Sequence, residues 1–573
     1  MVNAKINGIN IEIENGSSIL DAAKKVNINL PTLCNMYMAD GKTRNCKGTC
    51  RVCVVEVEGM GKLVPSCETE IKEGMSIKTH SLRAVRARRT IVELLLSNHP
   101  MDCLKCEKNN NCELQKLASD LGIDESAYAG ERSHFDIDMS DGFIRDREKC
   151  ILCRRCITVC NEVQKVNAIT VANRGFGSNI STFCNDSIEK TKCTYCGQCV
   201  AVCPTGALRE RSNYKKIWEV LDENKYSIVQ IAPSVRYALA EEFGLESGGL
   251  STGKIVTVLK LLGFNSVFDT NFAADLTIME EASEFIERFT KGEKLPLITS
   301  CCPAWIKYAE NNYYDKLDLI SSCKSPQQMF GALAKNYLPE KLGIKKEDIT
   351  VISIMPCIAK KHEAKRDEMI DVDNIRDVDI VITTRELAKL IRESGIDIVN
   401  LPDSDFDNPL GFSSGAGTIF GSSGGVMEAA LRTSYEWVTG NTLDEIDFEG
   451  VRGLEGVKEA NIDLNGIEVK IAVVSSLGNA KKIMDEIEEG NSKYHFIEVM
   501  ACPGGCIDGG GQPYIKSSRD ILKKRMSAMY KDDKTKVIRK SHENPMIKEL
   551  YSEYLKKPNS DIAHHILHVE YKK

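Results

Sequence analysis

Residues 299–305 of this 573-residue chain read TSCCPAW, and they follow the apolar run LPLI. An apolar run next to small and turn-forming residues predicts the end of a β-strand. Two adjacent cysteines, Cys301 and Cys302, stand at that end. Because neighbouring residues of an extended chain point to opposite sides, we expect these two thiols to have different roles.

Further strand-like runs share this pattern across the C-terminal part of the chain, and helical patterns separate them. The runs are YSIVQIAPS, DITVISIMP, VDIVITT, VKIAVVSSL and YHFIEVMA. Alternating strands and helices predict an α/β domain, which we place at residues 213–573. Sites in such sheets form where strand ends meet loops. The cysteines at these ends are therefore expected to hold one cluster: Cys302, Cys357, Cys502 and Cys506.

The whole chain has 23 cysteines, 42% hydrophobic residues and a net charge of −7. Its length exceeds what one hydrophobic core supports, so several domains are expected. The cysteines form tight local groups, which in a reducing compartment indicates metal ligands rather than disulfides. The N-terminal segment lacks the pattern of a signal peptide, and no apolar run reaches membrane-spanning length. We therefore expect a cytoplasmic protein without membrane segments, and its charge gives no case for binding nucleic acid.

The N-terminal segment, residues 1–80, has the pattern of a β-grasp domain. Alternating apolar residues flank an NG turn at positions 7 and 8, and SSILDAAKKVN predicts a capped amphipathic helix. Two thiolates three residues apart, with two more from neighbouring loops, can bind a 2Fe-2S cluster. A structural zinc site is the alternative, and Cys46 competes for one ligand position. The ligands that we assign are Cys34, Cys50, Cys53 and Cys67.

The next group lies between residues 81 and 125 and reads HPMDCLKCEKNNNC. It provides one imidazole and three thiols: His99, Cys103, Cys106 and Cys112. Such a set can bind a 4Fe-4S cluster with one histidine ligand, or a zinc ion, and the spacing does not separate the two. The preceding stretch SLRAVRARRTIVELLLSNH predicts a helix with four arginines on a solvated face.

A cysteine repeat follows, with CILCRRCITVC at 150–160 and CTYCGQCVAVC at 193–203. Both copies have the spacing of bacterial two-cluster ferredoxins, in which the fourth cysteine binds the other cluster. Residues 138–212 are therefore predicted to be a domain with two 4Fe-4S clusters. One cluster would be bound by Cys150, Cys153, Cys156 and Cys203, and the other by Cys193, Cys196, Cys199 and Cys160. The first 210 residues are thus expected to form a chain of electron carriers.

Three motifs of the α/β domain resemble the signature motifs of FeFe hydrogenases: TSCCPAW, MPCIAKK (355–361) and MACPGGCIDGGGQP (500–513). The resemblance covers essentially the whole chain and is closest to monomeric clostridial enzymes. It implies that the four strand-end cysteines hold an H-cluster. That cofactor is a 4Fe-4S cubane joined through the Cys506 sulfur to a diiron unit with CO, cyanide and a dithiomethylamine bridge. The implied reaction combines two protons and two electrons reversibly to hydrogen. One 2Fe-2S cluster and three accessory 4Fe-4S clusters complete the implied cofactor set.

Cyanide is an anion, and a buried anion needs a cation or hydrogen-bond donors. Lys360, three residues after Cys357, can provide an ammonium, and Ser234 can donate a hydrogen bond. The resemblance gives the same role to Lys360, Pro233 and Ser234. It also implies that four residues line the diiron pocket: Gln327, Met355, Phe420 and Met500. Ordinary core packing is the alternative for the methionines and the phenylalanine.

The resemblance also implies a proton path, which runs from Cys301 through Glu281, Ser321 and Glu284 to Arg288 at the surface. A thiol with a pKa of about 8.5 can lose and regain a proton near neutral pH. The two glutamates and the arginine are three and four residues apart, so they share one helical face. A solvated charged face is the alternative.

The glycine-rich stretch SSGAGTIFGSSGG (413–425) misses the dinucleotide-binding spacing, so we expect a close-packed turn before a helix there. Electrons should therefore come from a protein carrier, ferredoxin or flavodoxin, to a monomeric enzyme that maturation proteins supply with its diiron unit. Docking of an acidic carrier needs a basic patch. The two candidate groups are Arg83, Arg86, Arg88 and Arg89, or Arg145, Arg147, Arg154 and Arg155.

Two other functions fit parts of the sequence. A non-catalytic redox subunit is one, because the first 210 residues are similar to the large iron-sulfur subunit of respiratory NADH dehydrogenases, but the C-terminal cysteine motifs argue against it. A hydrogen sensor is the other, and the retained proton-path residues favour the enzyme. The C-terminal HHILH is expected to be part of an amphipathic helix. Four cysteines have no predicted ligand role: Cys46, Cys184, Cys301 and Cys323.

Overall fold

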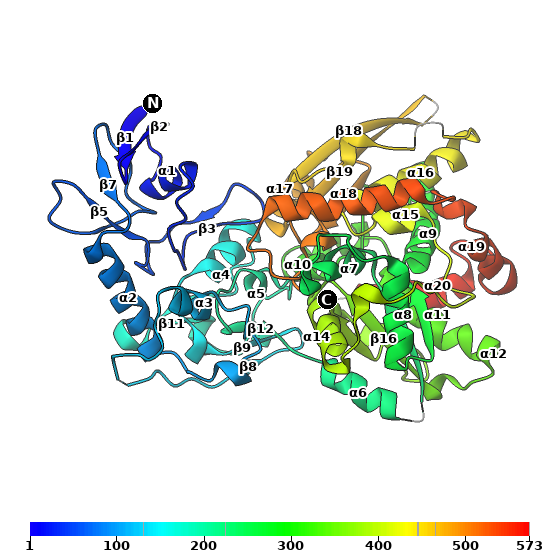
Figure 1. Ribbon diagram of the computed structural model, residues 1–573. Coiled ribbons are helices and arrows are strands. Elements are labelled where there is room, and N and C mark those ends of the chain that lie inside the picture. Colours follow the sequence, from blue (N-terminus) through cyan, green and yellow to red (C-terminus); the bar gives the residue numbers. More distant parts are fainter. Residues whose placement is uncertain (130, 224, 444–445, 465, 572–573) are drawn as a thin grey trace. The chain divides into compact units, whose positions relative to one another are not determined.

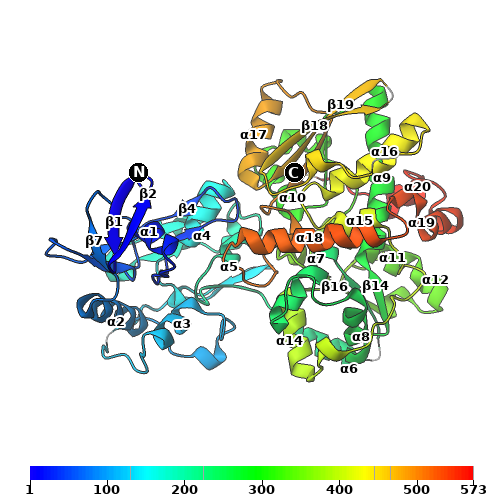
Figure 2. The same ribbon diagram turned by 45° about the horizontal axis from the view of Figure 1, so that its top comes forward.

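The computed structural model describes residues 1–573 apart from 130, 224, 444–445, 465 and 572–573. The chain forms two compact units whose segments alternate along the sequence. The first unit consists of Met1–Glu162, Asn167–Thr191 and Cys199–Arg209, and the second of Val163–Val166, Lys192–Gln198 and Glu210–Lys573. Figures 1 and 2 show the elements of each unit from two directions. Among the described helices, none has the length and apolar character that crossing a membrane requires.

The N-terminal part of the first unit is a mixed sheet in the order β2-β1-β7-β5-β6, in which β5 is Val54–Val57, β6 is Val64–Pro65 and β7 is Ser76–Lys78. Its hairpin joins β1 (Val2–Ile6) to β2 (Ile9–Ile13) through Asn7 and Gly8, whose φ angles are 51° and 87°. Positive φ at both central residues is what the predicted NG turn requires. Helix α1 (Ile19–Lys25) begins after Ser18, which caps it, and packs on the sheet. The sheet and the helix are as predicted, and β-grasp remains our interpretation of them.

Helices α2 (Leu82–Ser97) and α3 (Glu113–Asp120) follow in the first unit. The prediction that all four arginines of α2 lie on a solvated face is wrong for Arg88. That side chain is buried and donates hydrogen bonds to the carbonyl oxygens of Val54 and Thr79, each at 2.7 Å. These backbone carbonyl groups are fixed acceptors, so the guanidinium of Arg88 serves packing and not docking.

Two arginines of the second predicted docking group are also buried. Arg145 is buried and pairs with Asp138 at 2.9 Å, and Arg155 is buried and pairs with Glu113 at 2.7 Å. A guanidinium buried with a carboxylate partner holds its own unit together and is not available to an incoming protein. Of the eight arginines in the two groups, Arg83, Arg86, Arg89 and Arg154 are exposed.

The second unit has two four-stranded sheets, which confirms that its alternating pattern belongs to an α/β structure. One sheet is parallel, in the order β14-β13-β16-β17, and the other has the order β15-β20-β19-β18 with β18 antiparallel to its neighbour. The strands are β13 (Tyr226–Ile231), β14 (Ser266–Asp269), β15 (Leu297–Ile298), β16 (Ile349–Met355), β17 (Ile380–Thr383), β18 (Val457–Leu464), β19 (Ile467–Ser475) and β20 (Phe496–Met500). Every residue of β16 is buried, as strands covered on both faces require.

Helices pack on these sheets, and α9 (Thr270–Lys291) is central among them. It contacts α11 (Pro326–Asn336), α15 (Gly415–Ile419) and α16 (Gly425–Thr439), and its first fifteen residues are almost wholly buried. Helix α18 (Arg519–Thr535) runs beside α15 in both views (Figures 1 and 2). The chain then forms α19 (Pro545–Leu550), the short π-helix η15 (Tyr551–Leu555) and α20 (Asp561–Leu567), and α20 packs on α11.

Candidate active site

Three strands of the second unit, from its two sheets, end beside one buried cavity. After β15, Cys302 occupies the N-cap of α10 (Pro303–Asn312), and after β16 comes Cys357. The loop after β20 carries the other two cysteines of the predicted set. All four line the cavity: Cys302, Cys357, Cys502 and Cys506. Its walls are mostly apolar, which keeps water from the site.

The four thiols raise one another's pKa values. Burial and the nearby Cys302 raise the pKa of Cys357 to about 12, and burial with Cys357 raises that of Cys502 well above its usual value. Buried thiols that resist ionisation are converted to thiolates when bound metal supplies positive charge. Four such sulfurs around one cavity are the donor set of a 4Fe-4S cubane, so the residues present fit that group.

Glycines allow the loop after β20 to approach its neighbours closely. A Cβ on Gly505, whose φ is 87°, would lie 2.4 Å from the backbone nitrogen of Ser423. A Cβ on Gly509 would lie 2.2 Å from the carbonyl oxygen of Pro356. A larger residue at either position would force the loop away from these backbone atoms, so both glycines allow the close approach that this loop makes.

The other predicted pocket residues reach the same cavity. Its lining includes Cys301, Lys360 and the whole predicted set: Pro233, Ser234, Gln327, Met355, Phe420 and Met500. The Ser234 hydroxyl and the Gln327 side-chain oxygen are buried, and within the described part of the chain neither has a hydrogen-bond partner. Unpaired polar atoms in a buried wall indicate a polar ligand. The structure therefore brings together residues that are predicted to hold an anionic group.

Lys360 has a partner that the sequence analysis missed. Its Nζ donates to both carboxylate oxygens of Glu363, at 2.9 and 3.0 Å, and to the carbonyl oxygen of Cys301 at 3.2 Å. Burial lowers the pKa of Lys360, but the carboxylate of Glu363 raises it above its usual value overall. Glu363 also accepts from Gln327 at 3.0 Å. The i,i+3 spacing of Lys360 and Glu363 was a signal for this pair.

The predicted proton-path residues follow one another in space from the cavity toward the surface. Glu281 is fully buried on α9, and burial and Glu284 raise its pKa to about 8. Within the described residues, neither Glu281 oxygen has a well-formed hydrogen bond, although the Ser321 hydroxyl faces it. Ser321 donates to Glu284 Oε2 at 2.8 Å, and Arg288 donates to Glu284 Oε1 at 2.6 Å. The alternative of a solvated charged face is excluded for these buried glutamates.

Cys301 and Cys302 both line the cavity but differ in their surroundings. Cys302 accepts a hydrogen bond from the backbone nitrogen of Ala501 at 3.4 Å. Burial, followed by the charge of Glu281, raises the pKa of Cys301 well above its usual value. A thiol that keeps its proton beside a carboxyl group can donate that proton. The two neighbours therefore have the different chemical environments that their separate roles require.

In the first unit, each of the four predicted 2Fe-2S ligands contacts another member of the set. Hydrogen bonds from Cys50 and Cys67 lower the pKa of Cys34 to about 2, and Cys67 lowers that of Cys53 to about 6. The competitor Cys46 instead donates its thiol to the carbonyl oxygen of Cys67 at 2.9 Å. This arrangement favours Cys50 over Cys46 as a ligand and fits a 2Fe-2S cluster or a zinc ion.

The predicted histidine ligand, His99, is buried, and its Nδ1 has no hydrogen-bond partner within the described residues. Burial and the charge of Lys149 lower the pKa of His99 to about 4, so its imidazole is neutral at physiological pH. A neutral imidazole is the form that binds metal. Of the three cysteines in this set, Cys112 caps α3, and burial raises its pKa.

A second buried cavity lies in the first unit, and one predicted ferredoxin set lines it: Cys150, Cys153, Cys156 and Cys203. Apolar side chains such as Ile169 and Ile180 complete its wall. The other set is divided, because Cys160 and Cys199 belong to the first unit and Cys193 and Cys196 to the second. That set therefore stays a sequence prediction. Cys196 also lines the central cavity of the second unit.

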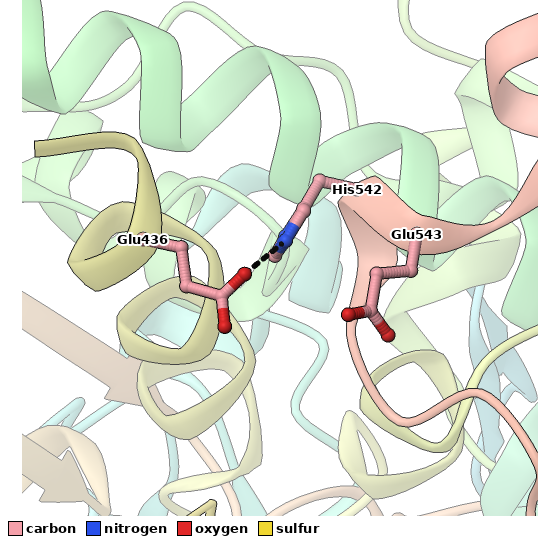
Figure 3. Close-up of side chains that lie close together, drawn as sticks. All are labelled: Glu436, His542 and Glu543. Carbon is pink, nitrogen blue, oxygen red and sulfur yellow. Dashed lines mark hydrogen bonds and ion pairs between the residues drawn. The ribbon is translucent and has the colours of Figure 1, made fainter. Parts of the chain in front are cut away.

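A separate group of possible metal ligands lies outside these cavities. Glu436, His542 and Glu543 bring their ligand atoms within 4.8 Å of one another, and His542 Nε2 lies 2.9 Å from Glu436 (Figure 3). The ammonium of Lys540 pairs with both carboxylates. Because a fixed cation already balances these acids, we assign no metal to this group.

Comparison with known proteins bears on the whole chain. Family models match at residues 225–510 (iron only hydrogenase large subunit, C-terminal domain) and 519–573 (iron hydrogenase small subunit). The preceding matches are a 2Fe-2S iron-sulfur cluster binding domain at 1–81, an NADH-ubiquinone oxidoreductase-G iron-sulfur binding region at 88–127, and an NADH-quinone oxidoreductase subunit 3 ferredoxin-like domain at 143–209.

Among individual proteins, the NADP-reducing hydrogenase subunit HndD of Solidesulfovibrio fructosivorans is 52% identical over 100% of this chain and 99% of its own. Iron hydrogenase 1 of Clostridium pasteurianum is 40% identical over 99% of both chains. A solved structure of the FeFe-hydrogenase HydA1 from Chlamydomonas reinhardtii has a TM-score of 0.57 and 42% identity, covering 63% of this chain and 99% of that one.

Proposed function

This chain belongs to the iron-only hydrogenase family, and we propose that it catalyses the reversible combination of two protons and two electrons to give hydrogen. The observation that carries the proposal is the meeting, at one apolar cavity, of the four predicted ligand cysteines with Cys301, a thiol that none of the predicted clusters uses. Four sulfurs fit the ligands of a cubane, and the fifth fits a proton donor. A redox subunit without catalysis would not need a proton donor at this cavity.

Within this proposal, the chain's own residues hold and orient the H-cluster. The cluster, when bound, supplies the iron at which protons and electrons combine. Cys302, Cys357, Cys502 and Cys506 would be its thiolate ligands. Lys360, kept charged by Glu363, would pair with one cyanide, and the unpaired Ser234 hydroxyl would donate to the other.

Proton delivery would use the predicted proton-path residues, of which Glu281, Glu284 and Arg288 lie on α9. Cys301 would be the last protein group before the cluster, and Glu281 would return a proton to it. With a pKa of about 8, Glu281 holds a proton at neutral pH and can still release it, as a general acid must. The Ser321 hydroxyl can receive a proton from Glu284 and pass on its own. Arg288 fixes Glu284 at the outer end.

Electrons would arrive through the accessory iron-sulfur centres predicted within the first 210 residues. Cys196, a predicted ligand of one 4Fe-4S cluster, lines the central cavity, so that cluster would be the last donor. We propose ferredoxin as the external partner, the cytoplasm as the location, and insertion of the diiron unit by maturation proteins. A partner subunit is the second candidate, because HndD is named as a subunit and because Leu104 and Phe183 are 93% and 86% exposed.

The test uses anaerobically matured protein and three electron sources: a small reduced dye, reduced ferredoxin, and NADPH alone. We expect hydrogen from the first two, because no stretch of the sequence has the spacing typical of a dinucleotide-binding loop. Hydrogen from the dye but not from ferredoxin would reject ferredoxin and favour a partner subunit. A matured protein that makes no hydrogen from any source would contradict the hydrogenase proposal.

A further inference from the structure

Backbone hydrogen bonds hold the C-terminal segment beside the proposed proton path. Leu567 accepts a hydrogen bond from the Lys324 backbone nitrogen at 2.8 Å, and the Val569 nitrogen donates to the Ser322 carbonyl at 2.7 Å. These two bonds form an antiparallel bridge that pairs Cys323 with His568. The bridge fixes the imidazole of His568, 246 residues away in sequence, next to the hydroxyl of Ser322.

A continuous series of polar contacts links Glu284 to this imidazole. Ser322 Oγ lies 3.4 Å from Glu284 Oε1 and 2.8 Å from His568 Nδ1. On its other side, His568 Nε2 lies 3.1 Å from Glu280 Oε2. Both His568 and Glu280 are buried. Glu284 thus has two outward connections, one to Arg288 and one through Ser322 to His568.

The partners of Glu280 determine which imidazole nitrogen carries hydrogen. The Glu280 carboxylate accepts from the Tyr551 hydroxyl and from the Asn559 backbone nitrogen, the latter at 2.7 Å. A carboxylate that accepts from several donors also accepts from His568, so Nε2 keeps its hydrogen. The remaining nitrogen, Nδ1, is then free to gain or lose a proton toward Ser322.

This geometry gives Ser322 two hydrogen-bond arrangements. When Nδ1 has no hydrogen, it accepts from the Ser322 hydroxyl, which cannot then donate to Glu284. When Nδ1 is protonated, it donates to Ser322 Oγ, and the hydroxyl hydrogen turns to Glu284 Oε1. A proton can then move inward along this series. The Nδ1–H bond of His568 breaks as Ser322 Oγ takes that proton, and Oγ releases its own proton to Glu284 Oε1.

We propose that Ser322 and His568 form a second proton branch at Glu284, parallel to the exit at Arg288. His568 is a positioning residue in this branch: it holds a proton and orients Ser322, and it touches neither cluster nor substrate. The inference rests on the proposed function, because a proton branch matters only if protons are consumed at the cavity. It adds the C-terminal segment to the proton-handling part of the molecule.

Solvent reaches the outer end of the branch. A cavity lined by Glu284, Arg288, Ser322 and the exposed His564 opens beside it, and the His564 ring lies 4.3 Å from the His568 ring. Each imidazole has two ring nitrogens that can hold or pass on a proton, so two neighbouring rings suit transfer from solvent. The titratable groups that contact His568 or its partners are Glu280, Glu284, Cys323, Tyr551 and His564. The adjoining cavity is also lined by Glu287, Arg288, Lys291, Glu293, Lys294, Asp318, Glu570 and Tyr571.

The first test measures hydrogen evolution from a reduced dye between about pH 6 and about pH 9. The variants are His568→Gln, Ser322→Ala, Arg288→Gln and the double variant of His568 and Arg288, with His565→Gln as an exposed control. We expect each single change to slow turnover and to change its pH profile. Turnover should not be abolished, because the other exit remains. The double variant should lose about tenfold more than the product of the single losses. Losses that simply multiply would overturn the branch.

The second test does not depend on turnover. Neutron diffraction from crystals of the matured wild-type protein, at one pD below and one above neutrality, locates the exchangeable hydrogens. We expect deuterium on both His568 nitrogens and a Ser322 hydroxyl directed at Glu284 at low pD, and deuterium on Nε2 alone with the hydroxyl directed at His568 at high pD. One unchanged hydroxyl orientation would overturn the branch. If the wild type evolves no hydrogen, the proposed function fails and these maps still decide the geometry.

Discussion

The hydroxyl of Ser321 donates a hydrogen bond to the Glu284 carboxylate across 2.8 Å. This contact connects the inner and outer parts of the proposed proton path. On the inner side the same hydroxyl faces Glu281, whose carboxyl group has no other well-formed partner within the described residues. A hydroxyl between two carboxyl groups can donate to one and accept from the other. The contact therefore suits proton transfer better than it suits stabilisation of a fixed charge.

Cys301 is expected to be the innermost member of the proposed proton path. Cys301→Ser should retain the clusters but lose most hydrogen evolution, because an alcohol is far less acidic than a thiol. Cys301→Asp should retain more turnover, since a carboxyl group can carry a proton. The measurement is dye-driven hydrogen evolution, with iron content and infrared spectra as loading controls. Near-normal turnover by a fully loaded Cys301→Ala protein would remove Cys301 from the path.

Glu281 should make stability depend on pH in a particular direction. Its pKa is about 8 in the folded chain and 4.5 in its ordinary state, so the native protein keeps a proton that the unfolded chain has released. Stability should therefore fall as pH rises from about 5 toward about 8, by an amount on the order of a few kcal/mol. Glu281→Gln should remove that loss. Melting temperatures across this range test it, with exposed Glu287→Gln as control, and parallel curves for wild type and Glu281→Gln would contradict the assignment.

The 2Fe-2S ligands can be separated from their competitor by one matched pair. Cys50→Ser should abolish the spectrum of this cluster, because Cys50 contacts Cys34 within the thiol group. Cys46→Ser should leave the spectrum intact, since that thiol donates to the carbonyl oxygen of Cys67. Electron paramagnetic resonance of the reduced full-length protein distinguishes the two. Loss of the signal in Cys46→Ser instead would exchange the two assignments.

The electron relay is tested better by a ligand change than by a truncation. Removing residues 1–209 would also remove Gln164 and Gln198, whose side chains donate to the carbonyl oxygens of Ala501 and Asp508, each at 2.9 Å. We expect Cys153→Ser to retain dye-driven hydrogen evolution and to lose most ferredoxin-driven evolution, because the dye can bypass the relay. Equal loss with both donors would indicate damage to the catalytic unit and not to the relay.

Cysteine motifs could be recognised in the sequence because the spacing within each motif is local, and their assignment as cluster ligands stays a prediction. The turn at Asn7 and the capped helix after Ser18 were predictable for the same reason. Long-range partners were not: nothing near His568 indicates that its ring meets Glu280, 288 residues away. Side-chain burial was also missed, since Arg88 belongs to an arginine-rich helix but turns toward backbone carbonyl groups.

The central claim is that the cavity at Cys302, Cys357, Cys502 and Cys506 holds an H-cluster. One infrared spectrum of the anaerobically matured full-length protein tests it most directly, because CO and cyanide ligands absorb where protein groups do not. We predict bands of both ligands in the wild type and their loss in Cys506→Ser, with the iron signals of the first unit unchanged. A wild-type spectrum without CO and cyanide bands, from protein matured alongside an active hydrogenase control, would contradict the account.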